Sequence, residues 1–254
     1  SYTTLAGVYI GTSALSVGVT MEAICTRFMV NKILKQLKAH EAQDNQVNPL
    51  SFRAINKFYY PLALTSMLTL GVHPLITFFI GKSVMPLESL AVLPVVSSFV
   101  FLFRGVGLSF QEAAITMLGI NPENDRVVYR FATMLGALLA GALIITAMTP
   151  LSKLWFSKVS GLTPELTGLA LTPLLIMGLF PASTVLISMQ RAILVKMGQT
   201  TRITTATIIE VVTIVSVLYV SIIHLQAIGV TAAASAFISG RLAANFYLSF
   251  KTNS

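Results

Sequence analysis

A few charged and polar side chains lie inside long apolar stretches of this sequence. Arg104, Gln111 and Glu112 occur within FLFRGVGLSFQEA, and Glu210 and Arg241 occur in two later apolar stretches. Burying an isolated charge at membrane depth costs about 2.5–3.5 kcal/mol or more, so such residues commonly mark substrate paths, ion paths or paired charges. These five residues are therefore the first candidates for a functional role.

The spacing of the first three residues predicts a shared helix face. Gln111 and Glu112 follow Arg104 by seven and eight positions, which places all three on one side of a helix. Arg104 and Glu112 are separated by about 12 Å along the axis, too far for a direct ion pair. We expect each to meet a partner on another helix or cavity water. A polar stripe lining a cavity is the functional interpretation, and a structural tie between helices is the alternative.

Glu210 and Arg241 are expected to pair with each other. Their two apolar stretches are joined by a very short turn and should run antiparallel, which brings the two residues to similar depths. An interhelical ion pair is the way in which membranes tolerate charge, so a structural role is favoured over a substrate or ion site. His73, next to Pro74, is a further candidate for the pathway, although a backbone carbonyl commonly satisfies a lone imidazole.

Other chemistry has no support in the sequence. It contains no His/Cys cluster at metal-ligand spacing, no G-x-S-x-G and no G-x-x-x-x-G-K-[ST] motif. We therefore expect no catalytic residues, no bound metal and no cofactor, and we do not expect an enzyme.

The composition indicates an integral membrane protein. Of the 254 residues, 55% are hydrophobic and only 10% are charged, whereas soluble domains carry about 25% charged residues. The single cysteine, Cys25, excludes a disulfide-rich secreted scaffold.

We predict an all-α membrane fold with seven transmembrane helices, since about 20 mostly apolar residues are needed to cross the hydrocarbon. The predicted spans are Leu5–Thr26, Ile55–Ile80, Leu87–Ile120, Val127–Thr149, Leu166–Gln190, Ile203–Ile223 and Ala227–Phe250. Prolines in the connections, at 49, 86, 122, 150 and 164, are expected to start or stop helices. The polar stretch 35–50 is predicted to be a linker between a lone first helix, residues 1–34, and a block of six helices, residues 51–254.

The distribution of basic residues predicts the orientation. The formal net charge is +8. Most basic residues fall on one predicted side of the membrane, in three connections and after the last span. They are Arg27, Lys32, Lys35, Lys38, Arg53, Lys57, Arg126, Arg130, Arg191, Lys196, Arg202 and Lys251; the other side holds Lys82, Lys153 and Lys158. By the positive-inside rule the N-terminus lies outside and the C-terminus in the cytoplasm of a plasma or inner membrane. The basic excess is then a topology signal, and nucleic acid is not an expected partner.

A seven-helix receptor shares this topology but little else. The third span does not end in an Asp-Arg-Tyr type triplet, the seventh lacks Asn-Pro-x-x-Tyr, and no cysteine pair is present to link outer loops. A receptor is therefore the least favoured interpretation.

Two segments resemble the MOP exporter superfamily, in particular its MATE (multidrug and toxic compound extrusion) branch. They are the linker leading into NKFYYPLALTSMLTLGVHPL and the later SMQRAILVKMGQTTRITTATIIE. The resemblance covers nearly the whole chain but about half of the family's length. It implies the last helix of a first lobe, a cytoplasmic linker and a complete six-helix C-terminal lobe, so we expect an incomplete chain whose partner is the N-terminal lobe.

The resemblance implies a secondary active transporter that works by alternating access. Organic cations, drugs or metabolites would be exported in exchange for Na⁺ or H⁺, with membrane lipids around the protein and Glu112 and Glu210 as the available membrane acids. The first helix of the second lobe lacks the acid that several drug exporters carry there. That departure leaves room for a flippase of the same fold that moves lipid-linked oligosaccharide or polysaccharide precursors, whose anionic phosphates Arg104 would suit.

Overall fold

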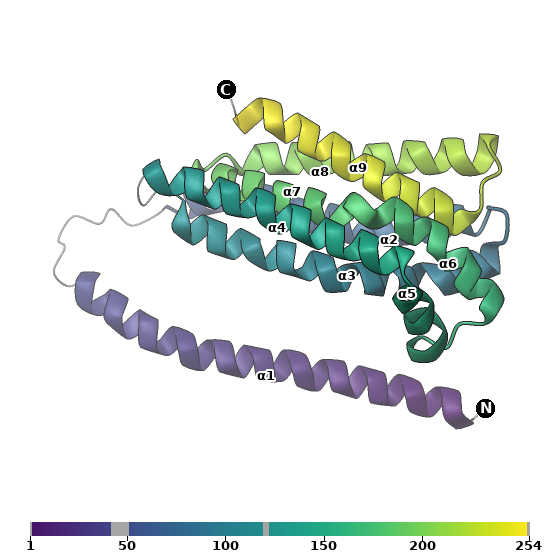
Figure 1. The fold of residues 1–254 in the computed structure, drawn as a ribbon. Helices are drawn as coiled ribbons and strands as arrows, with labels where there is room; N and C mark the ends of the chain where they lie inside the picture. The colour runs from purple at the N-terminus through teal and green to yellow at the C-terminus, as the bar shows by residue number, and fades with distance from the viewer. Residues whose placement is uncertain (1, 42–50, 119–121, 253–254) are drawn as a thin grey trace. The chain divides into compact units, whose positions relative to one another are not determined.

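The structure, a computed structural model, describes residues 2–41, 51–118 and 122–252 and is all-helical apart from short connections (Figure 1). The chain divides into two compact units, Ser1–Phe52 and Arg53–Ser254. Each unit is described by itself below.

From residue 2 to residue 41, the first unit is a single long helix, α1 (Tyr2–Glu41). The helix continues past Leu34 into the stretch predicted to be a linker, and the remaining predicted linker residues, 42–50, lie outside the described part. Every side chain from 11 to 31 is exposed, including the apolar Leu15 and Phe28. Assignment of this helix to a first lobe stays a prediction.

The second unit contains the remaining helices, several of which are joined end to end. In chain order they are α2 (Phe52–Ile80), α3 (Pro86–Met117), α4 (Pro122–Met148), α5 (Pro150–Leu154), η1 (Trp155–Val159), α6 (Pro164–Ile176), η2 (Met177–Leu179), α7 (Phe180–Lys196), α8 (Thr200–Tyr219), η3 (Val220–His224) and α9 (Gly229–Thr252). Proline is the first residue of α3, α4, α5 and α6, as predicted, because its fixed φ suits a first turn and its missing N–H is not needed there.

Six described helical segments are long and apolar enough to cross a membrane. They are Gly11–Asn31, Tyr59–Ile80, Pro86–Met117, Asp125–Met148, Pro164–Lys196 and Thr200–His224. The fold is therefore that of a multi-pass membrane protein. The seventh predicted span, Ala227–Phe250, is helical as α9 but falls outside this set, so the count of seven spans stays a prediction.

The fifth of these segments is not one continuous α-helix. Between α6 and α7 the chain tightens into the 3₁₀ turn η2, which contains Gly178, and Pro181 follows in the first turn of α7. Proline has no N–H to bond the carbonyl four residues earlier. The Met177 carbonyl instead accepts from the Phe180 N–H. Phe180, the first residue of α7 after this break, is buried in the interior of the unit.

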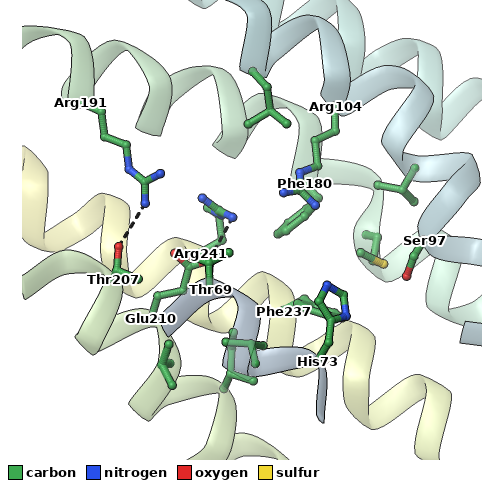
Figure 2. Close-up of a pocket in the computed structure, with 16 residues that line it drawn as sticks. Thr69, His73, Ser97, Arg104, Phe180, Arg191, Thr207, Glu210, Phe237 and Arg241 are labelled. Atoms are coloured by element: carbon green, nitrogen blue, oxygen red, sulfur yellow. Dashed lines mark hydrogen bonds and ion pairs between the residues drawn. The ribbon is translucent and has the colours of Figure 1, made fainter. Parts of the chain in front are cut away.

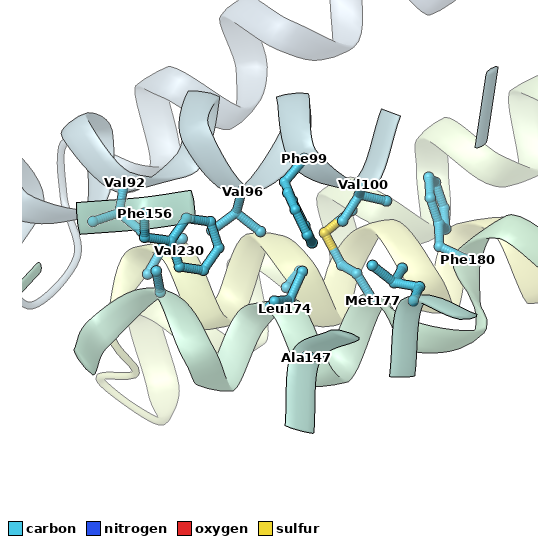
Figure 3. Close-up of a cluster of buried hydrophobic side chains, with 13 residues drawn as sticks. Val92, Val96, Phe99, Val100, Ala147, Phe156, Leu174, Met177, Phe180 and Val230 are labelled. Carbon is cyan, nitrogen blue, oxygen red and sulfur yellow. The ribbon is translucent and has the colours of Figure 1, made fainter. Parts of the chain in front are cut away.

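The largest apolar core joins α3, α4, α6 and α9 (Figure 3). Val92, Val96 and Phe99 of α3 pack there with Phe156 of η1 and Leu174 of α6. Phe99 makes ring contacts with Trp155 and Phe156, with centroids 5.4 and 5.7 Å apart. This core anchors α3 and the α6–α7 break, the two elements that carry Arg104 and Phe180.

Small residues bring α8 and α9 close together. A Cβ built on Gly240 would lie 2.6 Å from Cγ1 of Ile214 and 2.9 Å from the carbonyl oxygen of Glu210. Ala232, Ala233 and Ala236 of α9 are buried in the cluster that also contains Ile214. This close approach places the middle of α9 directly against the middle of α8, where Arg241 and Glu210 lie.

Candidate functional site

A polar pocket of about 230 Å³ lies inside the second unit (Figure 2). Helices α2, α3, α7, α8 and α9 and the turn η2 all contribute to its wall. Its apolar floor includes Val100, Met177 and Phe180, which also belong to the largest core. The polar lining consists of Thr69, His73, Ser97, Arg104, Arg191, Thr207, Glu210 and Arg241.

The Glu210–Arg241 pair expected from the sequence is present. Nη2 of Arg241 lies 3.0 Å from Oε1 of Glu210, and the two side chains are only 10% and 12% exposed, respectively. Because α8 and α9 pack tightly and run antiparallel, the two charges meet at the same depth, as the short connection predicted. The pair therefore fixes α9 to α8 at the edge of the pocket.

Arg104 approaches the pocket from the middle of α3. Its guanidinium carbon lies 5.0 Å from the centroid of the Phe180 ring, and that of Arg241 lies 5.3 Å from the same ring. Cation–π contacts of this kind help to hold a cation in an apolar wall. The buried Nε of Arg104 has no hydrogen-bond partner, and Arg104 forms no ion pair with a carboxylate in the described part of the chain.

Arg191 is part of the same pocket, which corrects the sequence-based placement. We predicted that Arg191 follows the fifth span, but α7 continues to Lys196 and carries Arg191 within the helix. Its Nη2 donates to Oγ1 of Thr207 on α8 at 3.3 Å, and its buried Nε has no partner. In Figure 2, Arg191 and Arg104 reach from two different helices toward the space beside Arg241 and Glu210.

The pocket therefore has an excess of positive charge. Three guanidinium groups line it, and Glu210 is the only carboxylate among its lining residues in the described chain. Arg191 interacts electrostatically with Arg104, Glu210 and Arg241 across this space. Since one arginine is matched by Glu210, the other two carry the unbalanced charge.

The structure does not bring Gln111 and Glu112 to this pocket. Gln111 is half-buried and Glu112 is exposed, and neither lines the cavity with Arg104. The three residues share a helix face, but the two later positions lie about two turns further along α3. Only Arg104 of the predicted polar stripe reaches this cavity, and a role for Gln111 and Glu112 elsewhere on the pathway stays a prediction.

His73 lies on the α2 side of the pocket. Its ring centroid is 6.5 Å from that of Phe237 on α9, and its side chain is exposed. The neighbouring Thr69 also lines the cavity. Helix α2 thus contributes Thr69 and His73 to the lining of the pocket.

The sequence contained a signal for the missed Arg191. Gly198 adopts a φ of 69°, the left-handed conformation that commonly follows a helix end. Had Gly198 been taken as the end of the fifth span, Arg191 would have fallen inside it. Phe180 directly precedes Pro181, and a proline inside the fifth predicted span was the available signal for a break at this point.

No protein-family model and no curated protein matches the sequence. Among solved structures, the chain matches the inward-facing conformation of a multidrug resistance MATE family transporter of the MOP superfamily, with a TM-score of 0.54 and 18% identity. The match covers 76% of this chain and 45% of the transporter, so the chain spans less than half of that protein's length. The resemblance seen in the sequence is thereby confirmed for the fold: the chain folds like part of a MATE family transporter of the MOP superfamily.

Proposed function

We propose that this protein is a secondary active transporter and that the second unit forms one lobe of it. The observation that carries the proposal is the pocket, in which guanidinium groups from α3, α7 and α9 and a carboxylate from α8 meet in the interior of apolar helices. Ionisable groups in such a position commonly line a substrate or ion path. Membrane lipids and a second lobe would complete the protein, which we place in a plasma or inner membrane.

The proposed mechanism is alternating access coupled to Na⁺ or H⁺. Glu210 is the candidate coupling acid, because it is the carboxylate that lines the pocket. Binding of a cation to Glu210 would compete with its ion pair to Arg241. Loss of that pair would loosen α9 from α8 and so link ion binding to helix movement.

Flux measurements test the proposal directly. The complete protein, including the proposed second lobe, is reconstituted in liposomes loaded with either ethidium or labelled phosphate, and an inward Na⁺ or pH gradient is imposed. We expect at least one gradient to accelerate release of one of the two solutes and an ionophore that collapses the gradient to abolish the effect. Release of both solutes at the rate seen in protein-free liposomes, under both gradients, would contradict secondary transport.

A point substitution connects the flux to the pocket. Arg104→Ala should reduce the flux at least about tenfold, since hydrogen bonds to a charged group contribute about 1.5–3 kcal/mol. Arg130→Ala is the matched control, because Arg130 is exposed on α4 and does not line the pocket. Equal flux in the two variants would remove Arg104 from the pathway.

A flippase for lipid-linked oligosaccharide or polysaccharide precursors is the second candidate function. The excess of guanidinium groups favours it, because arginine binds phosphate oxygens with two parallel hydrogen bonds. Movement of a fluorescent anionic lipid between the leaflets of the same liposomes, without flux of either solute, would select this alternative.

A further inference from the structure

Two of the arginines in the pocket have unused capacity to bind an anion. Arg241 is matched by Glu210 at 3.0 Å, whereas Arg104 and Arg191 have no ion-pair partner in the described chain. The Nε atoms of both, like that of Arg241, are buried without a hydrogen-bond partner, so the ion pair is what distinguishes Arg241 from the other two. A buried charged donor without a partner costs free energy, so a ligand that supplies acceptors is favoured there.

The size of the pocket limits the group that it can take. Its volume of about 230 Å³ is below the roughly 300–1,000 Å³ typical of pockets for drug-sized ligands. Its wall is also cationic, which repels an organic cation. The cavity fits a small, compact anionic group rather than a bulky cation.

We infer that the pocket binds a compact anion, a phosphate or carboxylate group, between Arg104 and Arg191. The two side chains come from α3 and α7, and Ser97 and Thr207 belong to the same lining. Guanidinium groups suit this role because their planar donors match two oxygens of a carboxylate or phosphate. The carboxylate of Glu210 is paired with Arg241, so it does not pair with Arg104 or Arg191.

The anion is the cargo of the transporter, and this assignment of its role rests on the proposed function. The binding site itself is tested without flux. The same chemistry is available from a free anion and from the headgroup of an anionic lipid, so the experiment measures both sources separately.

Equilibrium binding is measured by calorimetry on the protein in phosphatidylcholine nanodiscs. The soluble probes are inorganic phosphate and succinate, and the lipid probe is phosphatidylglycerol added to the nanodisc. Arg104→Gln and Arg191→Gln are compared with Arg130→Gln on the exposed face of α4. We expect each pocket variant to raise the Kd at least about tenfold and the control to leave it unchanged.

The lysine variants guard against misfolding. If a glutamine variant does not remain monodisperse, Arg104→Lys and Arg191→Lys replace it. Lysine keeps the charge but not the planar pair of donors. We then expect a Kd between those of the wild type and of a neutral variant.

The outcomes separate the sources and the hypotheses. Arginine-dependent binding of phosphate or succinate assigns the site to a free anion, and arginine-dependent binding of phosphatidylglycerol alone assigns it to a lipid headgroup. Failure of all three probes to bind, or equal affinities in the pocket variants and Arg130→Gln, overturns the inference. Gradient-driven ethidium flux that persists in both pocket variants would leave the transporter and the binding site standing but would show that the anion is not its cargo, whereas anion binding without any flux overturns only the transport role.

Discussion

At the scale of single residues, the ion pair between Glu210 and Arg241 is the main electrostatic contact of the site. Both side chains are about nine-tenths buried. Removing one partner of such a pair leaves an uncompensated charge in a place where water cannot solvate it. The pair should therefore matter to stability as well as to the pocket.

Glu210→Gln should destabilise the protein by about 3–5 kcal/mol, because Arg241 keeps its charge without a counter-ion. This loss corresponds to a fall of about 6 °C or more in the melting temperature in detergent. The double variant Glu210→Gln with Arg241→Gln removes both charges and should be more stable than the single variant. A double variant whose loss equals the sum of the two single losses would show that the charges act independently.

The sequence predicted part of this arrangement at residue level. Glu210 and Arg241 could be paired because a short connection fixes the relative depth of two antiparallel helices. Gln111 and Glu112 could not be separated from Arg104 in the same way. Residues at seven and eight positions share a helix face, and only the tertiary packing decides how far a cavity extends along it. Arg191 was missed because its placement depended on where one helix ends.

At the scale of elements, the contact between α8 and α9 depends on the absence of a side chain at Gly240. A Cβ there would enter the space of Ile214 and of the Glu210 carbonyl. Backbone cannot move aside as a flexible side chain can, so the two helices would have to separate. Separation would also lengthen the adjacent Glu210–Arg241 contact.

Gly240→Ala should therefore destabilise the protein by about 1–3 kcal/mol, the usual cost of overpacking. Gly141→Ala is the matched control: this glycine is also inside a helix, α4, and a Cβ there meets nothing within 4 Å. Alanine favours helix over glycine, so the control should be neutral or slightly stabilising. The melting temperatures of the two variants are compared in the same detergent, and we expect the lower value for Gly240→Ala. Equal values would show that α8 and α9 tolerate a wider spacing.

Most elements of the second unit could be predicted from apolar length and proline position. The starts of α3, α4, α5 and α6 coincide with prolines that the sequence placed in connections. Pro173 and Pro181 lie inside the predicted span Leu166–Gln190, where interior prolines are expected to kink a helix, but the sequence did not indicate the 3₁₀ turn η2 between them. Phe156 lies in η1, directly after α5, and is buried in the largest core. Hydropathy alone did not indicate this burial.

At the scale of the whole molecule, the predicted orientation follows from basic residues in the connections. Arg191 lies inside α7, and Arg126, Arg130 and Arg202 lie within the first turns of candidate spans, at the ends that the prediction places on the basic side. Lys82, Lys153 and Lys158 fall on the other. The N-terminus is therefore still expected outside and the C-terminus in the cytoplasm.

Cysteine labelling tests this orientation. In a Cys25→Ser background, Lys158→Cys and Arg126→Cys place single thiols at exposed positions on opposite predicted sides. A membrane-impermeant maleimide added to intact cells should label the cysteine at 158 and not the one at 126, and both should react after permeabilisation. The reverse pattern would invert the topology without affecting the fold.

Helix α9 also has a consequence for how the chain enters the membrane during synthesis. It carries Arg241 and is not among the described helices that are long and apolar enough to cross a membrane. Insertion of a central arginine by itself is unfavourable by about 2.5–3.5 kcal/mol. Glu210 is made first, on the helix that directly precedes α9 and packs against it. Glu210 is thus already present when Arg241 is synthesised and can pair with it during insertion. Helices α8 and α9 are therefore suited to leave the translocon together as one hairpin.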